Sequence, residues 1–130
     1  GMVPIAKEIT HIQHYIDIQS LRFSNKMNVN FEIKGDISSL NIAPMLLITF
    51  VENSFKHGNL KAPIRFVLNL ENGIEFITEN EIGSINKDTS SGIGLENVTK
   101  RLQLVYPKKH VLEINQIENI YKVHLKILPK

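Results

Sequence analysis

The sequence predicts an α+β fold, a two-layer sandwich in which about three helices cover one face of a mixed, mostly antiparallel sheet. Three segments have helical spacing, and two pairs of strand-like segments are each joined by a short turn. Helices separated by hairpins indicate one sheet that is apolar on one side. At 130 residues, the chain is expected to form one domain over 1–130.

The first predicted element is a helix over about 4–23. Pro4 suits a first helical position, and isoleucines then recur at helical spacing, at positions 5, 9, 12 and 16. The segment 28–34 follows, where apolar residues alternate up to Gly35. It is expected to be a half-buried strand.

The second predicted helix is bounded by Pro44, which opens it, and Gly58, which closes it as a C′ residue. Two strand-like runs, 64–70 and 74–78, then flank Asn72-Gly73, a strong hairpin signal. Antiparallel pairing of these runs is therefore predicted.

The last third of the chain begins with a polar segment over 81–91, which predicts a loop. Helical spacing resumes at Leu95 and ends near Tyr106-Pro107, and two final strands are expected at about 110–117 and 120–128. The sequence contains no internal repeat.

The composition limits the classes of partner. Lys and Arg number 15 against 13 Asp and Glu, so the net charge of +2 argues against a nucleic-acid partner. There is no cysteine, and no apolar run is long enough for a membrane span. Gly1 ahead of Met2 looks like the remnant of a cleaved tag, which predicts a longer parent protein.

The predicted second helix carries a polar stripe on an otherwise apolar segment. Thr49, Glu52, Asn53 and Lys56 fall at i, i+3, i+4 and i+7. Asn53 can supply an amide oxygen to Mg²⁺, Glu52 can hold a metal-bound water or orient an attacking hydroxyl, and Lys56 with His57 can reach phosphate oxygens. The alternative is a stripe that is only wetted by solvent at the rim of the core.

Two further segments carry candidate ligand groups. Gly92 and Gly94 precede a helix, where backbone N–H groups can hold a phosphate, and Arg101 either reaches a phosphate or pairs with surface acids. Strand alternation places Asn80 on the apolar face, where its amide suits the edge of adenine, unless it only caps the following loop. Glu79 then faces away.

Taken in order, these segments resemble the catalytic ATP-binding domain of sensor histidine kinases, most closely the LytS-like branch. This domain has the Bergerat ATP-binding fold, shared with gyrase and Hsp90-type ATPases. The resemblance covers nearly the whole chain, and two stretches carry most of it. Residues 51–58 look like the N box, and residues 92–107 look like the second glycine box with its helix.

The resemblance implies ATP and Mg²⁺ as cofactors. Asn53 would ligate Mg²⁺, Glu52 would assist phosphoryl transfer, and Lys56 and His57 would lie near the phosphates. Gly92 and Gly94 would line the triphosphate, with Leu95 and Arg101 following in the same nucleotide-binding segment. At the first glycine box the family commonly has Asp-x-Gly-x-Gly, whereas this chain has Asn80 in the Asp position and neither glycine.

The resemblance also implies partners that lie outside the sequence. The phosphoacceptor histidine would sit on an upstream helical segment, so this chain alone should not autophosphorylate. The parent would be a membrane-anchored homodimer with this domain in the cytoplasm, and it would pass its phosphoryl group to a response regulator. Two alternatives remain: a degenerate domain that acts by docking with weak or no nucleotide binding, and a serine kinase of the anti-sigma type.

Overall fold

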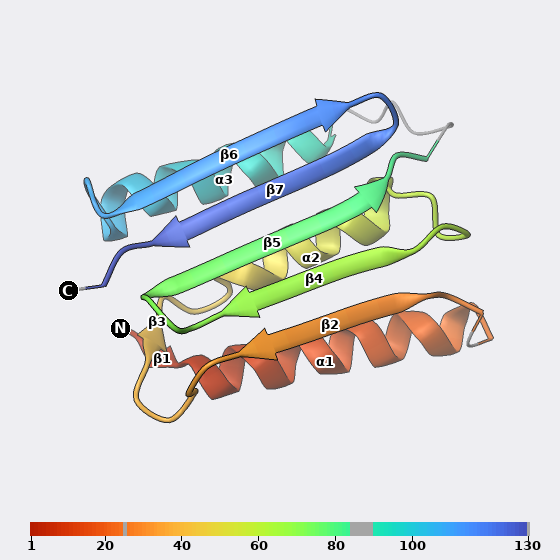
Figure 1. Cartoon of the computed structure of the whole chain (residues 1–130). Coiled ribbons are helices and arrows are strands. Elements are labelled where there is room, and N and C mark those ends of the chain that lie inside the picture. The colour runs from red at the N-terminus through yellow and green to blue at the C-terminus, as the bar shows by residue number, and fades with distance from the viewer. Residues whose placement is uncertain (25, 84–89, 130) are drawn as a thin grey trace.

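Five strands form one sheet, and three helices lie on one of its faces (Figure 1). The computed structural model describes the backbone of residues 1–24, 26–83 and 90–129, and the side chains of these residues except 90–94. The order of the strands across the sheet is β2 (Val29–Lys34), β4 (Ile64–Asn69), β5 (Ile74–Glu81), β7 (Ile120–Ile127) and β6 (His110–Ile117). β2 and β4 are parallel, and the other neighbouring pairs are antiparallel. The predicted fold class is confirmed.

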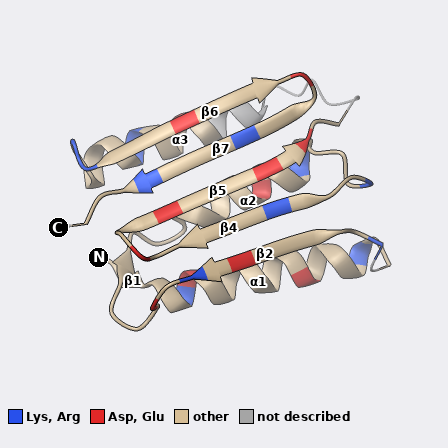
Figure 2. Ribbon diagram, viewed as in Figure 1, with Lys and Arg blue, Asp and Glu red and all other residues tan. Residues whose placement is uncertain are grey.

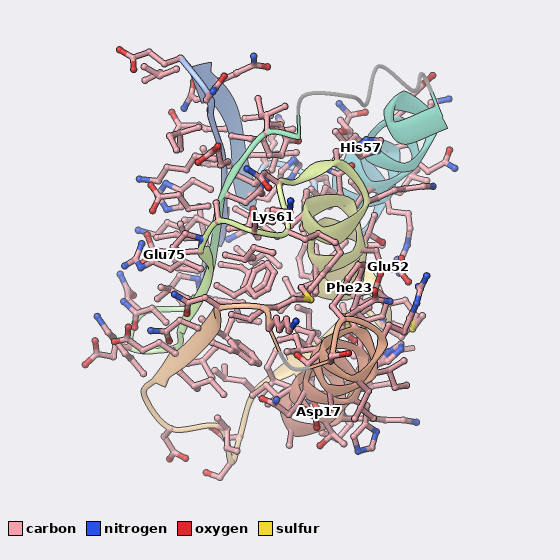
Figure 3. The ribbon with its side chains drawn as sticks, turned by 90° about the vertical axis from the view of Figure 1, so that its right-hand side faces the viewer. Asp17, Phe23, Glu52, His57, Lys61 and Glu75 are labelled. Carbon is pink, nitrogen blue, oxygen red and sulfur yellow. The ribbon has the colours of Figure 1, made fainter. Side chains whose placement is uncertain are left out.

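The helices are α1 (Ile5–Arg22), α2 (Leu46–His57) and α3 (Ser90–Val105). Figure 3 shows the sheet from one side, with all three helices on its right. α2 contacts both α1 and α3, so it is the central helix of the layer. Among the described residues, no helix has the length and hydropathy needed to cross a membrane.

Several boundaries differ from those predicted. β5 continues through Glu81, because Asn80 and Glu81 pair with Tyr121 and Ile120 of β7. The alternation in the sequence reaches Asn80, whereas Glu81, the first residue of the polar segment, carries no apolar signal for a strand. The helix expected from Leu95 begins at Ser90, and the predicted loop over 81–91 is reduced to a short connection whose residues 84–89 lie outside the described part.

A second, small sheet joins the start of the chain to the segment before α2. β1 (Val3–Pro4) pairs antiparallel with β3 (Asn41–Ile42). The sequence analysis missed this sheet because two residues are too few to show a period of two. It places the start of α1 beside the start of α2.

The core lies between the sheet and the helices. β5 shows the pattern most clearly, because Ile74, Phe76, Thr78 and Asn80 are buried on its helix side, while the intervening residues are only half-buried. The ring of Phe76 stacks on that of Phe66 with centroids 6.3 Å apart, in the offset or parallel range that aromatic pairs favour. The buried side of β5 therefore changes from apolar to polar toward the strand's end.

Candidate functional site

The first turn of α2 is anchored by a carboxylate from α1. Glu8 is 3% exposed, and its two oxygens accept the backbone N–H groups of Met45, Leu47 and Ile48 at 3.1, 2.9 and 3.3 Å. The first N–H groups of a helix have no partner within the helix, and a negative charge at that end is favourable. Glu8 thus caps α2 from 37 to 40 residues away and fixes the helix that carries the polar stripe.

Pro44 does not open α2 as predicted. The helix begins at Leu46, after Met45 in a left-handed conformation (φ 62°). Instead, the carbonyl oxygen of Pro44 accepts a hydrogen bond from Arg101 Nη2 at 2.8 Å. The guanidinium of Arg101 therefore ties α3 to the start of α2, at the opposite end of the helix from Lys56 and His57.

The other end of α2 is closed by Gly58, as predicted, but for a different reason. Its φ of −82° is open to any residue, so no left-handed conformation requires glycine here. A Cβ at this position would lie 2.4 Å from the carbonyl oxygen of Ser54 and 2.9 Å from Asn80 Nδ2. Glycine is needed because the end of α2 and the side chain of Asn80 approach each other closely.

The polar stripe on α2 is divided between two sides of the helix. Glu52 and Lys56 line a cavity of about 440 Å³ between α1 and α2, together with Tyr15 and Arg22. Figure 3 shows Glu52 on the side of α2 next to α1 and His57 on the side next to α3. The structure therefore does not place Glu52 and Asn53 in one cavity.

The surroundings of the cavity between α1 and α2 shift the pKa of its tyrosine. Burial raises the pKa of Tyr15, and the negative charge of Glu52 raises it further, while Arg22 lowers it. A carboxylate beside a phenol disfavours the phenolate. Glu52 thus acts on α1 in this structure.

Asn53 is turned the other way, toward the sheet. It is half-buried, and its Nδ2 donates a hydrogen bond to the hydroxyl of Tyr121 on β7 at 3.3 Å. Burial raises the pKa of Tyr121, and the hydrogen bond from Asn53 lowers it. The bond holds the amide in one orientation and leaves its carbonyl oxygen, Oδ1, as the atom that could meet a cation.

Three buried polar side chains belong to the end of β5 and the last turn of α2. Thr78 and Asn80 are 0% and 3% exposed on the helix side of β5, and Ser54, at 0%, belongs to the turn that Asn80 approaches. Asn80 Nδ2 donates to the carbonyl of Glu81 at 3.1 Å. The atoms Asn80 Oδ1, Thr78 Oγ1 and Ser54 Oγ have no hydrogen-bond partner among the described residues.

Such atoms are costly, because a buried acceptor or donor without a partner costs about 1–3 kcal/mol. Buried polar groups in native proteins nearly always have a protein, water or ligand partner. These three atoms therefore indicate a place where a polar ligand or ordered water completes the hydrogen bonding. The predicted inward orientation of Asn80 is observed, and Glu79 faces the opposite side, 3.8 Å from Arg65.

Gly92 and Gly94 lie within the first turns of α3, and not in a loop before it as predicted. Figure 1 shows α3 beginning at the end of the sheet where α2 and β5 end. Leu95 is half-buried and packs against the core. The side chains of Lys56, His57 and Asn80 thus come from the same end of the molecule as the two glycines.

The larger described cavity, about 800 Å³, is also at this end but lies between the turn after α1, the segment after α2 and the end of β5. Its lining includes Gly58 and Glu81, the neighbours of Asn80, but not Asn80 or Asn53 themselves. Among the described residues, no three His, Cys, Asp or Glu side chains are grouped to hold a metal.

Sequence reasoning missed Glu8, Thr78 and Tyr121. Thr78 shares the alternating face of Asn80, but only the structure shows that its hydroxyl is buried without a hydrogen-bond partner among the described residues. Glu8 and Tyr121 act through contacts 37 or more residues away, for which a single sequence has no signal. A charged residue on the apolar side of an amphipathic helix was the one available sign for Glu8.

Curated proteins of similar sequence include sensor proteins and sensor kinases. No family model matches the sequence. The sensor protein LytS of Enterococcus faecalis is 24% identical over 144 aligned positions, which cover 96% of this chain and 24% of LytS. The sensor protein kinase HptS of Staphylococcus aureus is 26% identical, over 95% of this chain and 28% of HptS. The chain thus spans about a quarter of the length of these curated relatives.

Solved structures with the same fold are histidine kinase domains. The catalytic domain of histidine kinase ThkA superimposes with a TM-score of 0.67 at 15% identity, covering 98% of this chain and 95% of the ThkA domain. Acinetobacter baumannii histidine kinase AdeS gives a TM-score of 0.67 at 10% identity, covering 98% of this chain and 66% of AdeS. At these identities the likeness establishes the fold.

Proposed function

We propose that this chain, a homologue of the LytS and HptS sensor histidine kinases with the fold of a histidine kinase catalytic domain, binds Mg-ATP and presents its γ-phosphate to a phosphoacceptor histidine outside residues 1–130. The observation that carries the proposal is the group of unpartnered buried atoms at Asn80, Thr78 and Ser54. Adenine offers an N6 amino donor, which Asn80 Oδ1 would accept. The hydroxyls of the other two would complete the contacts.

The residues present fit the phosphates and the metal as well. Asn53 Oδ1 would ligate Mg²⁺, which prefers oxygen ligands and shares its remaining positions with water and substrate phosphates. Lys56 and His57, at the end of α2, and the free backbone N–H groups of the first turn of α3, which include that of Gly92, would neutralise and position the triphosphate. Gly94, in the next turn, would let the phosphates approach the backbone without a Cβ in the way. Glu52 would assist transfer of the phosphoryl group.

Glu52, Lys56 and Arg101 need different orientations for the roles implied by the resemblance. Glu52 and Lys56 line the cavity next to α1, and Arg101 bonds to Pro44. Glu52 would reach a phosphoacceptor from this side only if the acceptor approached α2 over α1. Arg101 in its present contact supports the start of α2, at the end of the helix opposite Lys56 and His57.

Isothermal titration calorimetry with Mg-ATP tests nucleotide binding directly. We expect saturable binding that Asn53→Ala abolishes and Asn80→Ala weakens, with Asn30→Ala, an exposed Asn on the outer face of β2, as the matched control. A titration without heat, together with no thermal shift, would favour the degenerate docking module.

The base provides a sharper test. Guanine presents a carbonyl acceptor, O6, where adenine presents its amino donor, so GTP would set two acceptors against each other at Asn80 Oδ1. We expect Mg-GTP to bind at least about tenfold more weakly than Mg-ATP, since one good polar contact is worth about 1–3 kcal/mol of discrimination. Equal affinities would contradict the assignment of Asn80 to the base.

The acceptor is tested in the longer parent protein. We expect radiolabel from γ-labelled ATP to appear on a histidine, in an acid-labile linkage, and to be lost in Asn53→Ala. Label on a serine would instead support the kinase of the anti-sigma type.

As further parts of the proposal, the parent is a membrane-anchored homodimer with this domain in the cytoplasm, and a response regulator accepts the phosphoryl group. Nucleic acid is not among its partners.

A further inference from the structure

The outer edge of the sheet at β6 has little of the usual protection against pairing with another chain. No described segment pairs with this edge of β6, and all eight of its residues are within the described part. Exposed edge strands are usually short, or carry charged side chains, especially lysine, or a proline or a bulge. β6 is eight residues long, has no lysine or proline and pairs with β7 without a bulge, so Glu113 is its one charged side chain and Figure 2 shows one acidic band on the strand.

The opposite edge of the sheet differs. β2 carries Glu32 and Lys34, which form an ion pair at 3.6 Å on its outer face. On β6, by contrast, Val111 and Ile117 are 50% and 72% exposed on the outer face, and Ile114 is 41% exposed on the helix side. Apolar side chains therefore flank the free main chain of β6 on both faces.

The pairing with β7 shows which main-chain groups are free. Leu128 N–H donates to the carbonyl of Lys109 at 2.8 Å, so residue 109 directs its main chain toward β7. Hydrogen-bonded pairs alternate along an antiparallel ladder, so residues 111, 113, 115 and 117 do the same. The N–H and C=O groups of residues 110, 112, 114 and 116 point away from β7, to the free edge.

A second β6 can meet this edge in one favourable register. If a two-fold axis passes through Ile114, this residue faces its own copy, and each pair of facing residues has numbers that sum to 228. Residue 112 of one chain then faces residue 116 of the other, and the two form hydrogen bonds through their free main-chain groups. The same register places Val111 opposite Ile117 and Glu113 opposite Asn115 on the outer face. It also places His110 opposite Glu118, and no like charges face each other.

Neighbouring registers are worse. An axis at Glu113 sets the two Glu113 carboxylates directly opposite each other, which is destabilising. An axis at Asn115 pairs only residues 113–117 and leaves Val111 without a cross-strand partner. In a register shifted by one residue, the sum is odd and each even-numbered residue faces an odd-numbered one. The helices of the two chains would then lie on opposite faces of the joined sheet.

We propose that two copies of this chain associate through β6, antiparallel and centred on Ile114, to form one continuous sheet across both domains. The partner is a second copy because the strand is complementary to itself in this register, and the net charge of +2 per chain opposes the approach only slightly. Strand pairing alone gives an interface below about 1,200 Å², the class of weak and transient complexes. The proposal does not depend on nucleotide binding.

Charge at position 115 tests the register, because each dimer contains the 113–115 pair twice. Asn115→Lys creates two opposite-charge pairs across the interface and Asn115→Glu two like-charge pairs. Position 115 is exposed and faces Lys122 of β7 within each chain, so the folding of both variants is checked separately. We expect the dimer dissociation constant to fall by about 2- to 30-fold with lysine and to rise by a similar factor with glutamate.

Sedimentation velocity at protein concentrations up to about 1 mM, with circular dichroism to confirm folding, provides the measurement. Asn30→Lys and Asn30→Glu on the other edge strand are the matched controls and should leave the constant unchanged. The proposal is overturned if the chain and Asn115→Lys are both monomeric over this range, or if the two edges respond equally.

Disulfide trapping gives a second readout, since the chain has no cysteine. Residues 113 and 115 would form non-hydrogen-bonded pairs with Cα atoms about 4.5 Å apart, within disulfide range, whereas 113 and its own copy would be diagonal at about 7–8 Å. Mixed Glu113→Cys and isotopically labelled Asn115→Cys chains should give mainly heterodimers on oxidation. A statistical mixture of homodimers and heterodimers would refute the register.

Discussion

Removing the carboxylate of Glu8 should destabilise the whole domain through the start of α2. In Glu8→Ala, three backbone N–H groups lose their acceptor, and those of Leu47 and Ile48 are buried. Each buried donor without a partner costs about 1–3 kcal/mol, and hydrogen bonds to charged groups are at the upper end of the range. We expect a loss of about 3–5 kcal/mol in the free energy of unfolding.

That loss is a large part of the total. A domain of 130 residues is typically stable by roughly 6–20 kcal/mol. With a urea m value of about 2 kcal/mol/M, the midpoint of unfolding should fall by about 1.5–2.5 M. Glu8→Gln keeps the size of the side chain but loses its charge, so we expect an intermediate loss of about 2–3 kcal/mol.

Urea titration followed by circular dichroism gives the stabilities, and amide hydrogen exchange locates the effect. The amides of Leu47 and Ile48 should lose protection more than those of β4 or β5. Glu96→Ala is the control, because Glu96 is two-thirds exposed in an ion pair with Lys100 and should change stability by less than about 0.5 kcal/mol. A loss below about 1 kcal/mol in Glu8→Ala would show that water replaces the carboxylate and that the cap is dispensable.

Three further substitutions or conditions test the end of α2 and its neighbours. Gly58→Ala should cost more than about 2 kcal/mol, since the new Cβ would meet main chain at 2.4 Å and the Asn80 amide at 2.9 Å; a neutral change in urea midpoint would show that the approach relaxes freely. Tyr121→Phe removes the hydrogen bond to Asn53 and should cost about 0.5–1.5 kcal/mol and weaken Mg-ATP binding several-fold by calorimetry; unchanged affinity would rule out a positioning role. The raised pKa values of Tyr15 and Tyr121 mean that the folded state holds these phenol protons more tightly than the unfolded state does. The resulting contribution to the free energy of unfolding is complete below about pH 10 and is lost as the pH rises above it. Urea midpoints from pH 9 to 11.5 should fall more steeply for the chain than for the variant with Phe at both positions, and parallel curves would contradict these shifts.

The sequence was sufficient for the elements whose signals are local. The isoleucine spacing of α1, the Asn72-Gly73 turn and the alternation of β5 are each contained within a few residues, and the structure has all three. The inward orientation of Asn80 followed from the same alternation. Local physics was enough because each of these features is decided by neighbours in the chain.

What the sequence could not provide depends on contacts between distant segments. Periodicity placed Glu52 and Asn53 on one polar stripe of α2. In the folded chain Glu52 faces α1 and Asn53 faces β7, which only the packing of α2 against these elements decides. The sequence predicted correctly that α2 ends at Gly58, but not why glycine is needed there. The reason is the close approach of Asn80, which is a tertiary contact. Arg101 likewise found its partner, the Pro44 carbonyl, 57 residues away.

The parallel pairing of β2 with β4 has a consequence for how the chain folds. The two strands are joined by residues 35–63, a crossover that contains all of α2. The chain must lose the entropy of closing this long loop before the pairing of β2 with β4 can stabilise the fold. Such non-local steps slow folding. By contrast, the β4–β5 and β6–β7 hairpins close over a few residues. We therefore expect both hairpins to form early and β2, with the helix that carries Asn53, to dock last.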